Sequence, residues 1–247
     1  MRAGLGIVTF ERFDRFKECF ENLLKNRGDL DRIVIVDDAS IKDRKKYDEY
    51  FKNILVNDID VVVSEKNMGV AHSKNTVLKH LYDLGCEYMF TLEDDINVVN
   101  SEVFNKYIEL AEKSGFHYFN FGLHGPANVG KGKKYEVDNV EFMIYPESVG
   151  AFSLHTKQLI DEIGFYDENY VNAWEHVDYA YVASMVGLTT PFWSFIDLVD
   201  SDKYLQEQKG SIEDSSIRPR TDWKDNIHKG LRYWEKKHKV YLFDIPR

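Results

Sequence analysis

Short apolar runs alternate with longer amphipathic segments through the first hundred residues. Four runs have the length and β-branched content of buried strands, at residues 4–10, 32–36, 60–64 and 88–92. Three segments between them carry apolar side chains at helical spacing, at residues 14–24, 45–55 and 70–84. Strands that alternate with helices favour a mostly parallel sheet with helices on both faces. We therefore predict an α/β fold.

The second half of the chain has a less regular pattern. Helices are expected at residues 101–113, 157–163, 175–186 and 222–238, and strands at residues 117–122 and 137–145. Residues 125–134 are rich in Gly and Lys, which predicts a mobile loop. Internal repeats and low-complexity linkers are absent from the sequence. We therefore expect one domain.

Polar clusters follow three of the predicted strands, at residues 9–12, 37–38 and 93–95. Ligands of open α/β sheets bind beyond the carboxyl ends of the strands. The convergence of these clusters at one edge of the sheet is therefore the main indication of a binding site.

The charge of the chain restricts its partners. With 42 acidic and 32 basic residues in 247, the formal net charge is −10, which argues against a nucleic-acid partner. Cys19 and Cys86 are too few for a disulfide framework, so we expect a cytoplasmic location. The apolar run near the first residue is too short for a secretory signal, and none has the length of a membrane span.

Glu93, Asp94 and Asp95 directly follow the fourth predicted strand. Carboxylates at the end of an apolar strand are costly to bury without partners, and adjacent ones repel one another. A divalent cation relieves both costs, because Mg²⁺ and Mn²⁺ bind carboxylate oxygens together with substrate phosphates. A solvated acidic loop is the alternative interpretation, and the triplet alone does not separate the two.

Two other stretches carry candidate chemistry. Asp37 and Asp38 either form a helix cap or Asx turn, or accept hydrogen bonds from a base or ribose. Asn67 and Gly69 predict a tight turn, after which a helix opens with an N-terminus suited to anions. Lys74 would place a positive charge near a bound diphosphate.

Five segments, taken in order, make the chain resemble the family 2 glycosyltransferases, which have the nucleotide-binding GT-A fold. The segments are IVTFERFDRFKECFENLL, IVIVDDAS, NMGVAHSKN, YMFTLEDD and IGFYDENYVNAWEHVDYAYVA. They are similar to the family's opening strand and helix, its V-D-D-x-S segment, its N-x-G-x-x-x-A-R-N stretch, its D-x-D motif and its G-x-F-D-E-x-F…E-D-V-D region. Lys74 replaces the usual Arg, Glu93 the first Asp of D-x-D, and His176 the second acid of the late pair.

The resemblance covers roughly residues 3 to 200 and implies a single GT-A domain. Its central sheet would be mixed but mostly parallel, and flanked by helices. Residues 1–100 would form a Rossmann-like half that binds the nucleotide sugar, residues 101–221 an acceptor-binding half, and residues 222–247 a C-terminal helix and tail.

On the donor side the resemblance implies a nucleotide-sugar site. Its residues would be Thr9, Glu11, Asp37, Asp38, Asn67, Gly69, Lys74, Glu93 and Asp94. The first three would contact the nucleoside, and Lys74 the diphosphate. Asp95 would be the principal ligand of Mn²⁺ or Mg²⁺, aided by Glu93, with Asp200 in place of the late histidine of relatives. A UDP-sugar is the expected donor, and GDP- and dTDP-sugars are alternatives.

On the acceptor side an inverting transfer requires a base that removes the proton of the attacking hydroxyl. The candidates are Glu175, His176 and Asp178, with Glu175 preferred. Glu175 and Asp178 have an alternative role in complementing the dipole of their helix. Trp174 is expected either to stack on the acceptor sugar or to pack, and His124 to lie near the acceptor.

These expectations describe an inverting, nonprocessive glycosyltransferase with a glycan acceptor, as a monomer or homodimer. A sugar-phosphate nucleotidyltransferase is one alternative, but it would need a Gly-rich basic loop where this chain has VTFERFDRF. A catalytically inactive nucleotide- or glycan-binding relative is the other, with a purely structural helix at Glu175.

Overall fold

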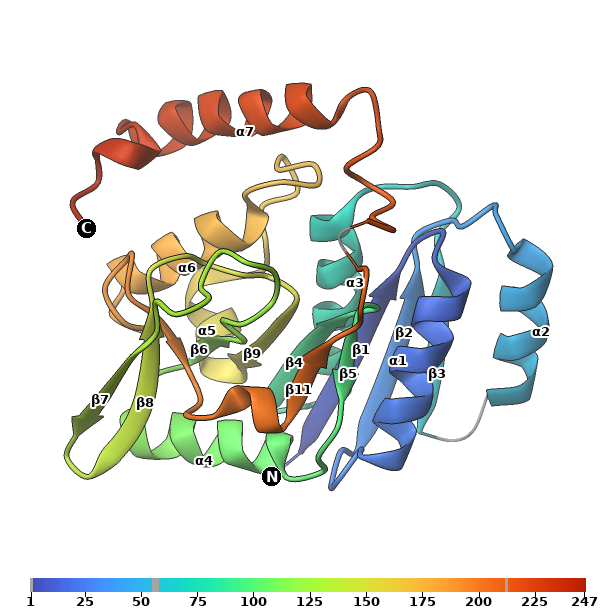
Figure 1. Ribbon diagram of the computed structural model, residues 1–247, viewed down its shortest axis with the longest axis horizontal. Helices are drawn as coiled ribbons and strands as arrows, with labels where there is room; N and C mark the ends of the chain where they lie inside the picture. The colour runs from blue at the N-terminus through green and yellow to red at the C-terminus, as the bar shows by residue number, and fades with distance from the viewer. Residues whose placement is uncertain (1, 55–57, 212) are drawn as a thin grey trace.

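The computed structural model describes residues 2–54, 58–211 and 213–247. Among these residues a six-stranded sheet has the order β3-β2-β1-β4-β9-β6 (Figure 1). Its strands are β1 (Ala3–Thr9), β2 (Arg32–Asp37), β3 (Ile59–Val63), β4 (Tyr88–Glu93), β6 (Tyr118–Asn120) and β9 (Phe152–Thr156). Strands β1 to β4 pair in parallel, whereas β9 is antiparallel to both of its neighbours. The predicted mixed, mostly parallel sheet is confirmed.

Each helix predicted from the spacing of apolar residues is present, with ends within two residues of those expected. They are α1 (Phe13–Lys25), α2 (Arg44–Ile54), α3 (Val70–Asp83), α4 (Val103–Ser114), α5 (Lys157–Ile163), α6 (Glu175–Met185) and α7 (Trp223–His238). The last residue of the helix predicted at 45–55 lies outside the described residues.

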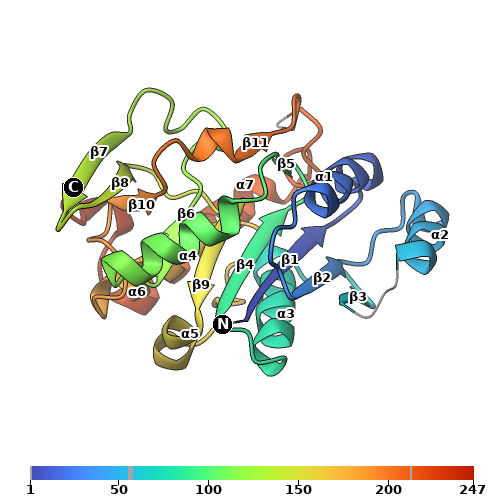
Figure 2. The same ribbon diagram turned by 90° about the horizontal axis from the view of Figure 1, so that it is seen from below.

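Two hydrophobic cores lie on opposite faces of the sheet. Ile33 and Ile35 belong to one core with side chains of α1, α2 and α4, and Val34 and Val36 belong to the other with side chains of α3, α5, α6 and α7. This division follows from the strand geometry, because successive side chains point to opposite faces. Figure 2 shows α1 and α3 on the two sides of the sheet.

Two smaller sheets flank the central one. One has the order β10-β8-β7 and consists of β7 (Lys133–Val137), β8 (Val140–Tyr145) and β10 (Phe195–Asp197). The other pairs β5 (Ile96–Val98) with β11 (Leu205–Glu207). The single strand expected at residues 137–145 was wrong, because Asp138 and Asn139, with φ of 51° and 63°, turn the chain into a hairpin. The expected loop at residues 125–134 accordingly ends two residues early, where β7 begins.

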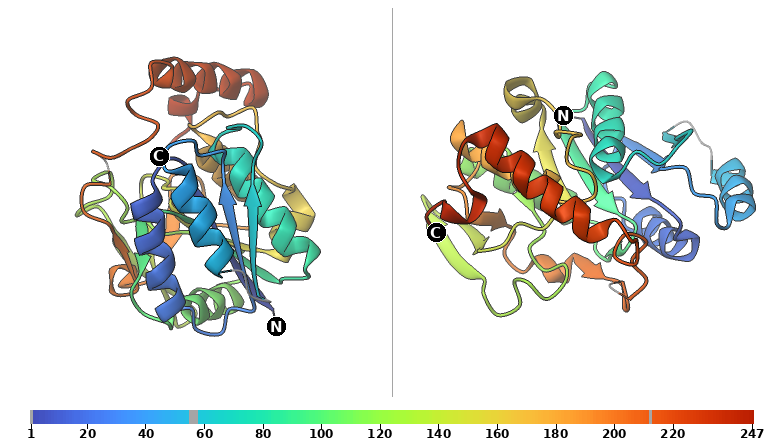
Figure 3. Two further views of the ribbon diagram at one scale, coloured as in Figure 1. Left: turned by 90° about the vertical axis from the view of Figure 1, so that its right-hand side faces the viewer. Right: turned by 90° about the horizontal axis from the view of Figure 1, so that it is seen from above.

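The C-terminal helix α7 lies beyond the edge of the sheet toward which the parallel strands point (Figure 3). Two short 3₁₀ turns lie on either side of α7 in the sequence, η1 (Ser201–Lys203) before it and η2 (Leu242–Asp244) after it. None of the helices in the described ranges is long and apolar enough to cross a membrane. Cys19 and Cys86 are buried free thiols, in agreement with the expected absence of a disulfide framework.

Candidate active site at the carboxyl edge of the sheet

The three polar clusters meet at one edge of the sheet, as predicted. The register pairs Thr9 with Asp37 across β1 and β2, and Val8 with Glu93 across β1 and β4. The hydroxyl of Thr9 donates a 2.7 Å hydrogen bond to Asp94 Oδ2. A small cavity of about 60 Å³ lies among these strand ends, lined in part by Thr9, Asp38 and Asp94.

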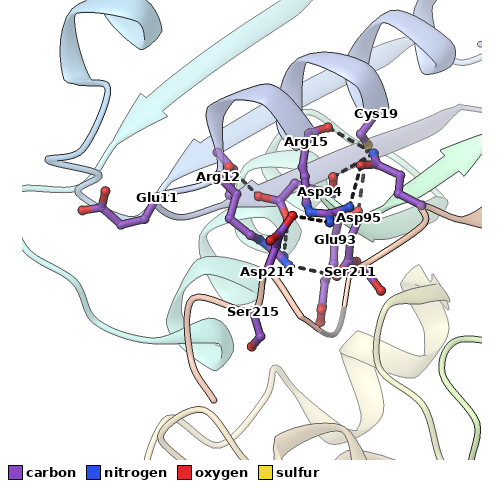
Figure 4. Close-up of polar contacts among 12 residues, drawn as sticks. Glu11, Arg12, Arg15, Cys19, Glu93, Asp94, Asp95, Ser211, Asp214 and Ser215 are labelled. Atoms are coloured by element: carbon purple, nitrogen blue, oxygen red, sulfur yellow. Dashed lines mark hydrogen bonds and ion pairs between the residues drawn. The ribbon is translucent and has the colours of Figure 1, made fainter. Parts of the chain in front are cut away.

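Arg12, at the start of α1, supplies a positive charge to the acidic triplet (Figure 4). Its guanidinium pairs with Asp94 Oδ1 and, at 3.0 Å, with Asp95 Oδ2. Burial raises the pKa of Asp94 in spite of Arg12. Burial acts in the same direction on Asp95, but the neighbouring His124 and Arg12 outweigh it and lower the pKa of Asp95. Of the two aspartates, Asp95 is therefore the one held more firmly as an anion.

Asp95 keeps one oxygen without a partner. Its Oδ1 is buried and accepts no hydrogen bond from any residue in the described ranges, although Oδ2 is paired with Arg12. The Nε2 atom of His124 lies 3.7 Å from Asp95 Oδ2 and 3.5 Å from Glu207 Oε1, and it also has no hydrogen-bond partner. Among the described residues, no group of three or more acidic, histidine or cysteine side chains is arranged to hold a metal ion. Asp95 Oδ1 is thus a buried carboxylate oxygen without a hydrogen-bond partner among the described residues.

A segment that we call the strap, residues 208–211 and 213–222, lies next to this site. Figure 4 shows its residues Ser211, Asp214 and Ser215 beside the triplet. Its backbone is joined to the triplet by a 2.8 Å hydrogen bond from Gln208 N to Asp95 O. Arg15 pairs with Asp214 at 2.6 Å. Arg218 and other strap residues line a second cavity of about 150 Å³, together with Arg12, Glu93, Asp95 and His124. The sequence analysis did not identify the strap.

The acidic pair at the end of β2 holds two loops in place. Asp37 accepts hydrogen bonds from Ser40 N at 3.0 Å and from Arg44 Nη1 at 2.8 Å. Asp38 accepts hydrogen bonds from Met68 N at 3.0 Å and from Gly69 N at 2.9 Å. Of the two interpretations left open, the turn-forming role is therefore the one that the contacts display. Asp38 also lines the small cavity.

Glu11 does not point toward the triplet. Its carboxylate accepts hydrogen bonds from Ile41 N at 2.8 Å and Lys42 N at 2.7 Å, in the connection between β2 and α2. Figure 4 shows Glu11 directed away from Asp94 and Asp95. The structure therefore does not bring Glu11 to the cavity that Thr9 lines.

The turn before α3 is as predicted, and it brings in a residue that the sequence analysis missed. Gly69 has φ of 93°, a value that favours glycine. The side chain of Asn67 donates a 2.9 Å hydrogen bond to Asp38. Asn172 Oδ1 accepts a hydrogen bond from Val70 N at 3.2 Å, at the first turn of α3. Asn172 lines both donor-side cavities and the larger cavity described below.

Lys74 lies beneath the site and not at the expected diphosphate position. Its side chain is fully buried, and its Nζ lies 2.8 Å from Glu93 Oε1 and 3.5 Å from Glu175 Oε1. The Nζ also donates a 2.8 Å hydrogen bond to Gly150 O. A lysine is almost never fully buried without such partners. Lys74 thus connects the end of β4 to the start of α6.

The N-terminal end of α6 borders a cavity of about 480 Å³. Its wall includes Glu175, His176 and three tryptophans, Trp174, Trp193 and Trp223. Glu93, His124 and Asn172 line both this cavity and the 150 Å³ cavity beside Asp95. The structure therefore brings the predicted acceptor residues next to the predicted donor residues.

Trp174 both lines the cavity and packs. Its Nε1 donates a 3.1 Å hydrogen bond to Ile227 O of α7, and its ring lies against Gly230. A Cβ atom at position 230 would lie 2.5 Å from Trp174 Cδ1, so the close approach requires glycine. The side chain of Trp174 is therefore fixed by the C-terminal helix.

Asp178 is turned away from the cavity and anchors α7. It is buried, and it accepts hydrogen bonds from Tyr170 OH at 3.0 Å, Lys237 Nζ at 2.7 Å and His238 Nε2 at 2.7 Å. Asp200, the expected substitute metal ligand, is exposed and pairs with Lys203. Neither Asp178 nor Asp200 is among the described residues that line the three cavities at the triplet and at Glu175.

Comparison with known proteins agrees with these features. The sequence profile described as glycosyl transferase family 2 matches residues 5–163. A protein of Acanthamoeba polyphaga mimivirus, described as an uncharacterized glycosyltransferase, is 23% identical over 229 residues, which are 88% of this chain and 85% of the viral protein.

Several solved glycosyltransferases share the fold at low identity. The Pyrobaculum calidifontis mannosyltransferase in complex with GDP-Man and Mn²⁺ has a TM-score of 0.58 and 15% identity, over 82% of this chain and 58% of its own. GalNAc-T7 with UDP, GalNAc and Mn²⁺ has a TM-score of 0.60 and 13% identity, over 97% and 51%. S. aureus TarS 1-349 with UDP has a TM-score of 0.53 and 15% identity, over 74% and 55%. The chain spans about half the length of these structures, and the likeness concerns the GT-A fold.

Proposed function

The chain belongs to glycosyl transferase family 2, and on that premise we propose that it is an inverting, nonprocessive, metal-assisted glycosyltransferase. It would move one sugar from a nucleoside diphosphate sugar, of the UDP type, to a hydroxyl of a glycan acceptor. The observation that supports this most directly is that Glu93 lies between the cavities at the acidic triplet and the cavity at the start of α6. Glu93 lines the cavities beside Asp94 and Asp95, and also the tryptophan-walled cavity at α6.

The donor would occupy the carboxyl edge of the sheet. Thr9, Asp38 and Asn67 line the inner cavity, and Asp95 and Arg218 line the outer one. These cavities, of about 60 and 150 Å³, are smaller than the roughly 300 Å³ or more of typical ligand pockets. We therefore expect the strap to move outward when the donor binds.

The residues present are compatible with a divalent cation. Asp95 offers one unpaired carboxylate oxygen, and Glu93 lines the same cavity. Magnesium-type sites commonly use one or two carboxylates, with the remaining ligands from water and substrate phosphates. When bound, the ion would neutralise charge on the departing diphosphate. Arg12 would keep the two neighbouring carboxylates ionised and fixed while the anionic donor approaches.

The acceptor would occupy the 480 Å³ cavity, where an apolar wall with a few polar groups suits a sugar ring. Its attacking hydroxyl would lie between the donor and the start of α6. The proton of that hydroxyl would pass to the Glu175–His176 pair, and excess charge on Glu175 is balanced by buried Lys74. The bond between the anomeric carbon and the phosphate oxygen would break, and its electron pair would leave with the nucleoside diphosphate.

A transfer assay tests this function. The protein is incubated with Mn²⁺, a panel of UDP-, GDP- and dTDP-sugars, and a panel of glycan acceptors, and the released nucleotide is quantified. The anomeric configuration of the product is then determined by NMR. We expect nucleoside diphosphate release that depends on the acceptor, with inversion at the anomeric carbon.

Other outcomes would overturn the proposal. Retention of the anomeric configuration would refute the inverting mechanism. Release of pyrophosphate from a nucleoside triphosphate and a sugar phosphate would identify a nucleotidyltransferase. Binding of nucleotide without turnover by any donor and acceptor pair would identify a binding protein.

A further inference from the structure

His176 and Glu175 form a pair in the wall of the cavity that we assign to the acceptor. His176 Nδ1 lies 3.2 Å from Glu175 Oε1. Both residues line the 480 Å³ cavity, but the side chain of Glu175 is only 4% exposed, whereas that of His176 is 23% exposed. Of the two, the imidazole is therefore the group that is more accessible from the cavity.

The carboxylate of Glu175 is held from its other side by Lys74. Lys74 Nζ lies 3.5 Å from Glu175 Oε1, and its other partners are Glu93 at 2.8 Å and the carbonyl of Gly150 at 2.8 Å. Burial raises the pKa of Glu175, but a charged His176, the hydrogen bond from His176 and the charge of Lys74 outweigh it and lower the pKa. The Glu175 carboxylate is therefore placed to stabilise an imidazolium at His176.

The backbone at Gly150 fixes the imidazole ring. A Cβ atom at this position would lie 2.9 Å from His176 Cγ, so the ring packs directly against the glycine. The carbonyl of the same glycine accepts the hydrogen bond from Lys74. The ring and the lysine that holds Glu175 are thus placed by one residue.

The contact with Glu175 also selects a tautomer. With the proton on Nδ1 donated to the carboxylate, Nε2 carries the lone pair, as in the carboxylate–histidine arrangement of serine hydrolases. None of the described residues donates to or accepts from Nε2 in a hydrogen bond. Other charged groups in the cavity wall are Glu93, His124, Glu147 and Arg218.

We infer that His176 is the general base of the proposed transfer, acting through Nε2, and that Glu175 and Lys74 are positioning residues. This inference rests on the proposed function. The acceptor oxygen forms its bond to the anomeric carbon while its O–H bond breaks and the proton passes to Nε2. The bond from the anomeric carbon to the phosphate oxygen breaks, and its electron pair leaves with the nucleoside diphosphate. The resulting imidazolium is stabilised by the anionic Glu175.

Three variants and a matched control test the assignment. His176→Gln removes the proton acceptor, and we expect kcat to fall at least about 100-fold, which is the usual scale of general-base catalysis. His176→Asp supplies a carboxylate base in its place, and we expect it to recover at least tenfold over His176→Gln. Glu175→Gln keeps the shape of the positioning residue and should still bind UDP. His80→Gln, on the surface of α3, is the control and should keep wild-type kcat.

The pH profile separates a base from a residue that only supports the fold. The acid limb of kcat/KM should move to lower pH by at least about one unit in His176→Asp, because carboxylates titrate below imidazoles. UDP affinity and the melting temperature should match the wild type in both His176 variants.

The inference is overturned if His176→Gln keeps more than half of the wild-type kcat. It is also overturned if the acid limb stays in place in His176→Asp, since the titrating base would then be another group. Both results presuppose a wild-type enzyme that transfers sugar, whereas a wild type without transfer refutes the proposed function itself.

Discussion

The contacts of Asp178, a predicted catalytic residue, allow the effect of its replacement on the free energy of unfolding to be predicted. The residue is buried and accepts hydrogen bonds from Tyr170, Lys237 and His238, so it joins α6 to the C-terminal helix. If this anchoring is its function, Asp178→Ala should destabilise the protein without acting on the chemistry directly. If it is a catalytic acid or base, Asp178→Ala should abolish transfer and leave the free energy of unfolding nearly unchanged.

The contacts set the size of the effect. Removal of one partner of a buried ion pair costs about 3–5 kcal/mol, because the other charge is left uncompensated. Lys237 retains Asp167 at 2.8 Å, so its charge is only partly orphaned, whereas the buried hydroxyl of Tyr170 loses its acceptor. We therefore expect a loss of about 3 kcal/mol for Asp178→Ala, at the lower end of that range. Asp178→Asn keeps an acceptor oxygen and should lose less.

Urea unfolding followed by circular dichroism gives the free energy of unfolding. For a domain of this size, a loss of about 3 kcal/mol corresponds to a fall of roughly 6–12 °C in Tm. Asp200→Asn is the matched control, because this carboxylate is exposed, pairs among the described residues with exposed Lys203, and has a φ of 56° that asparagine tolerates. It should leave stability unchanged. A change below about 1 kcal/mol in Asp178→Ala, together with loss of transfer in the folded variant, would refute the anchoring role.

Three further predictions follow from particular contacts. Arg12→Met should lower the free energy of unfolding by about 3 kcal/mol, because buried Asp94 loses its cation. Arg15→Met should lower it less, because its partner Asp214 is exposed, and urea unfolding of the two variants tests the difference. Gly230→Ala should lower Tm in spite of the better helix propensity of alanine, because the added Cβ would lie 2.5 Å from Trp174 Cδ1. The same substitution should cost less in a Trp174→Ala background, where that clash is absent, and a double-mutant cycle measures the difference. Burial lowers the pKa of His155 to about 3, below its unfolded value of about 6.5, so stability is fully present above pH 6.5 and is lost as pH falls toward 3. His155→Gln should reduce the slope of unfolding free energy against pH between 6 and 4 by about 1.4 kcal/mol per unit, and an unchanged slope would contradict the assignment.

The first half of the fold could be predicted from the sequence because its signals are local. Each of the strands β1 to β4 is a short apolar run, and each helix between them has apolar residues at helical spacing. Strand β9 was missed, although it is fully buried, because FSLHT mixes polar and apolar residues and pairs antiparallel with β4, 60 to 68 positions earlier. The three-residue strands β5, β10 and β11 are too short to show a period.

The candidate site was predictable where backbone register determines it. Thr9, Asp38 and the acidic triplet lie together because they end adjacent parallel strands. The partners of Arg12 and Lys74 were not predictable, because they lie 19 or more positions away and are brought near only by packing. Lys74 illustrates the difference, since its place in α3 was predicted but its burial beneath Glu93 was not. The strap lies outside the five family-like segments, and Asn172 lies within the fifth at a position that its motif does not specify.

The central claim is that this site binds a nucleoside diphosphate together with a divalent cation at Asp95. Isothermal titration of UDP into the wild type and into Asp95→Asn, each with and without Mn²⁺, tests it most directly. We predict that Mn²⁺ tightens UDP binding by at least about tenfold in the wild type, equivalent to roughly 1.4 kcal/mol, and has no such effect in Asp95→Asn. Equal UDP affinity in all four titrations, or no binding of UDP in any of them, would contradict the account.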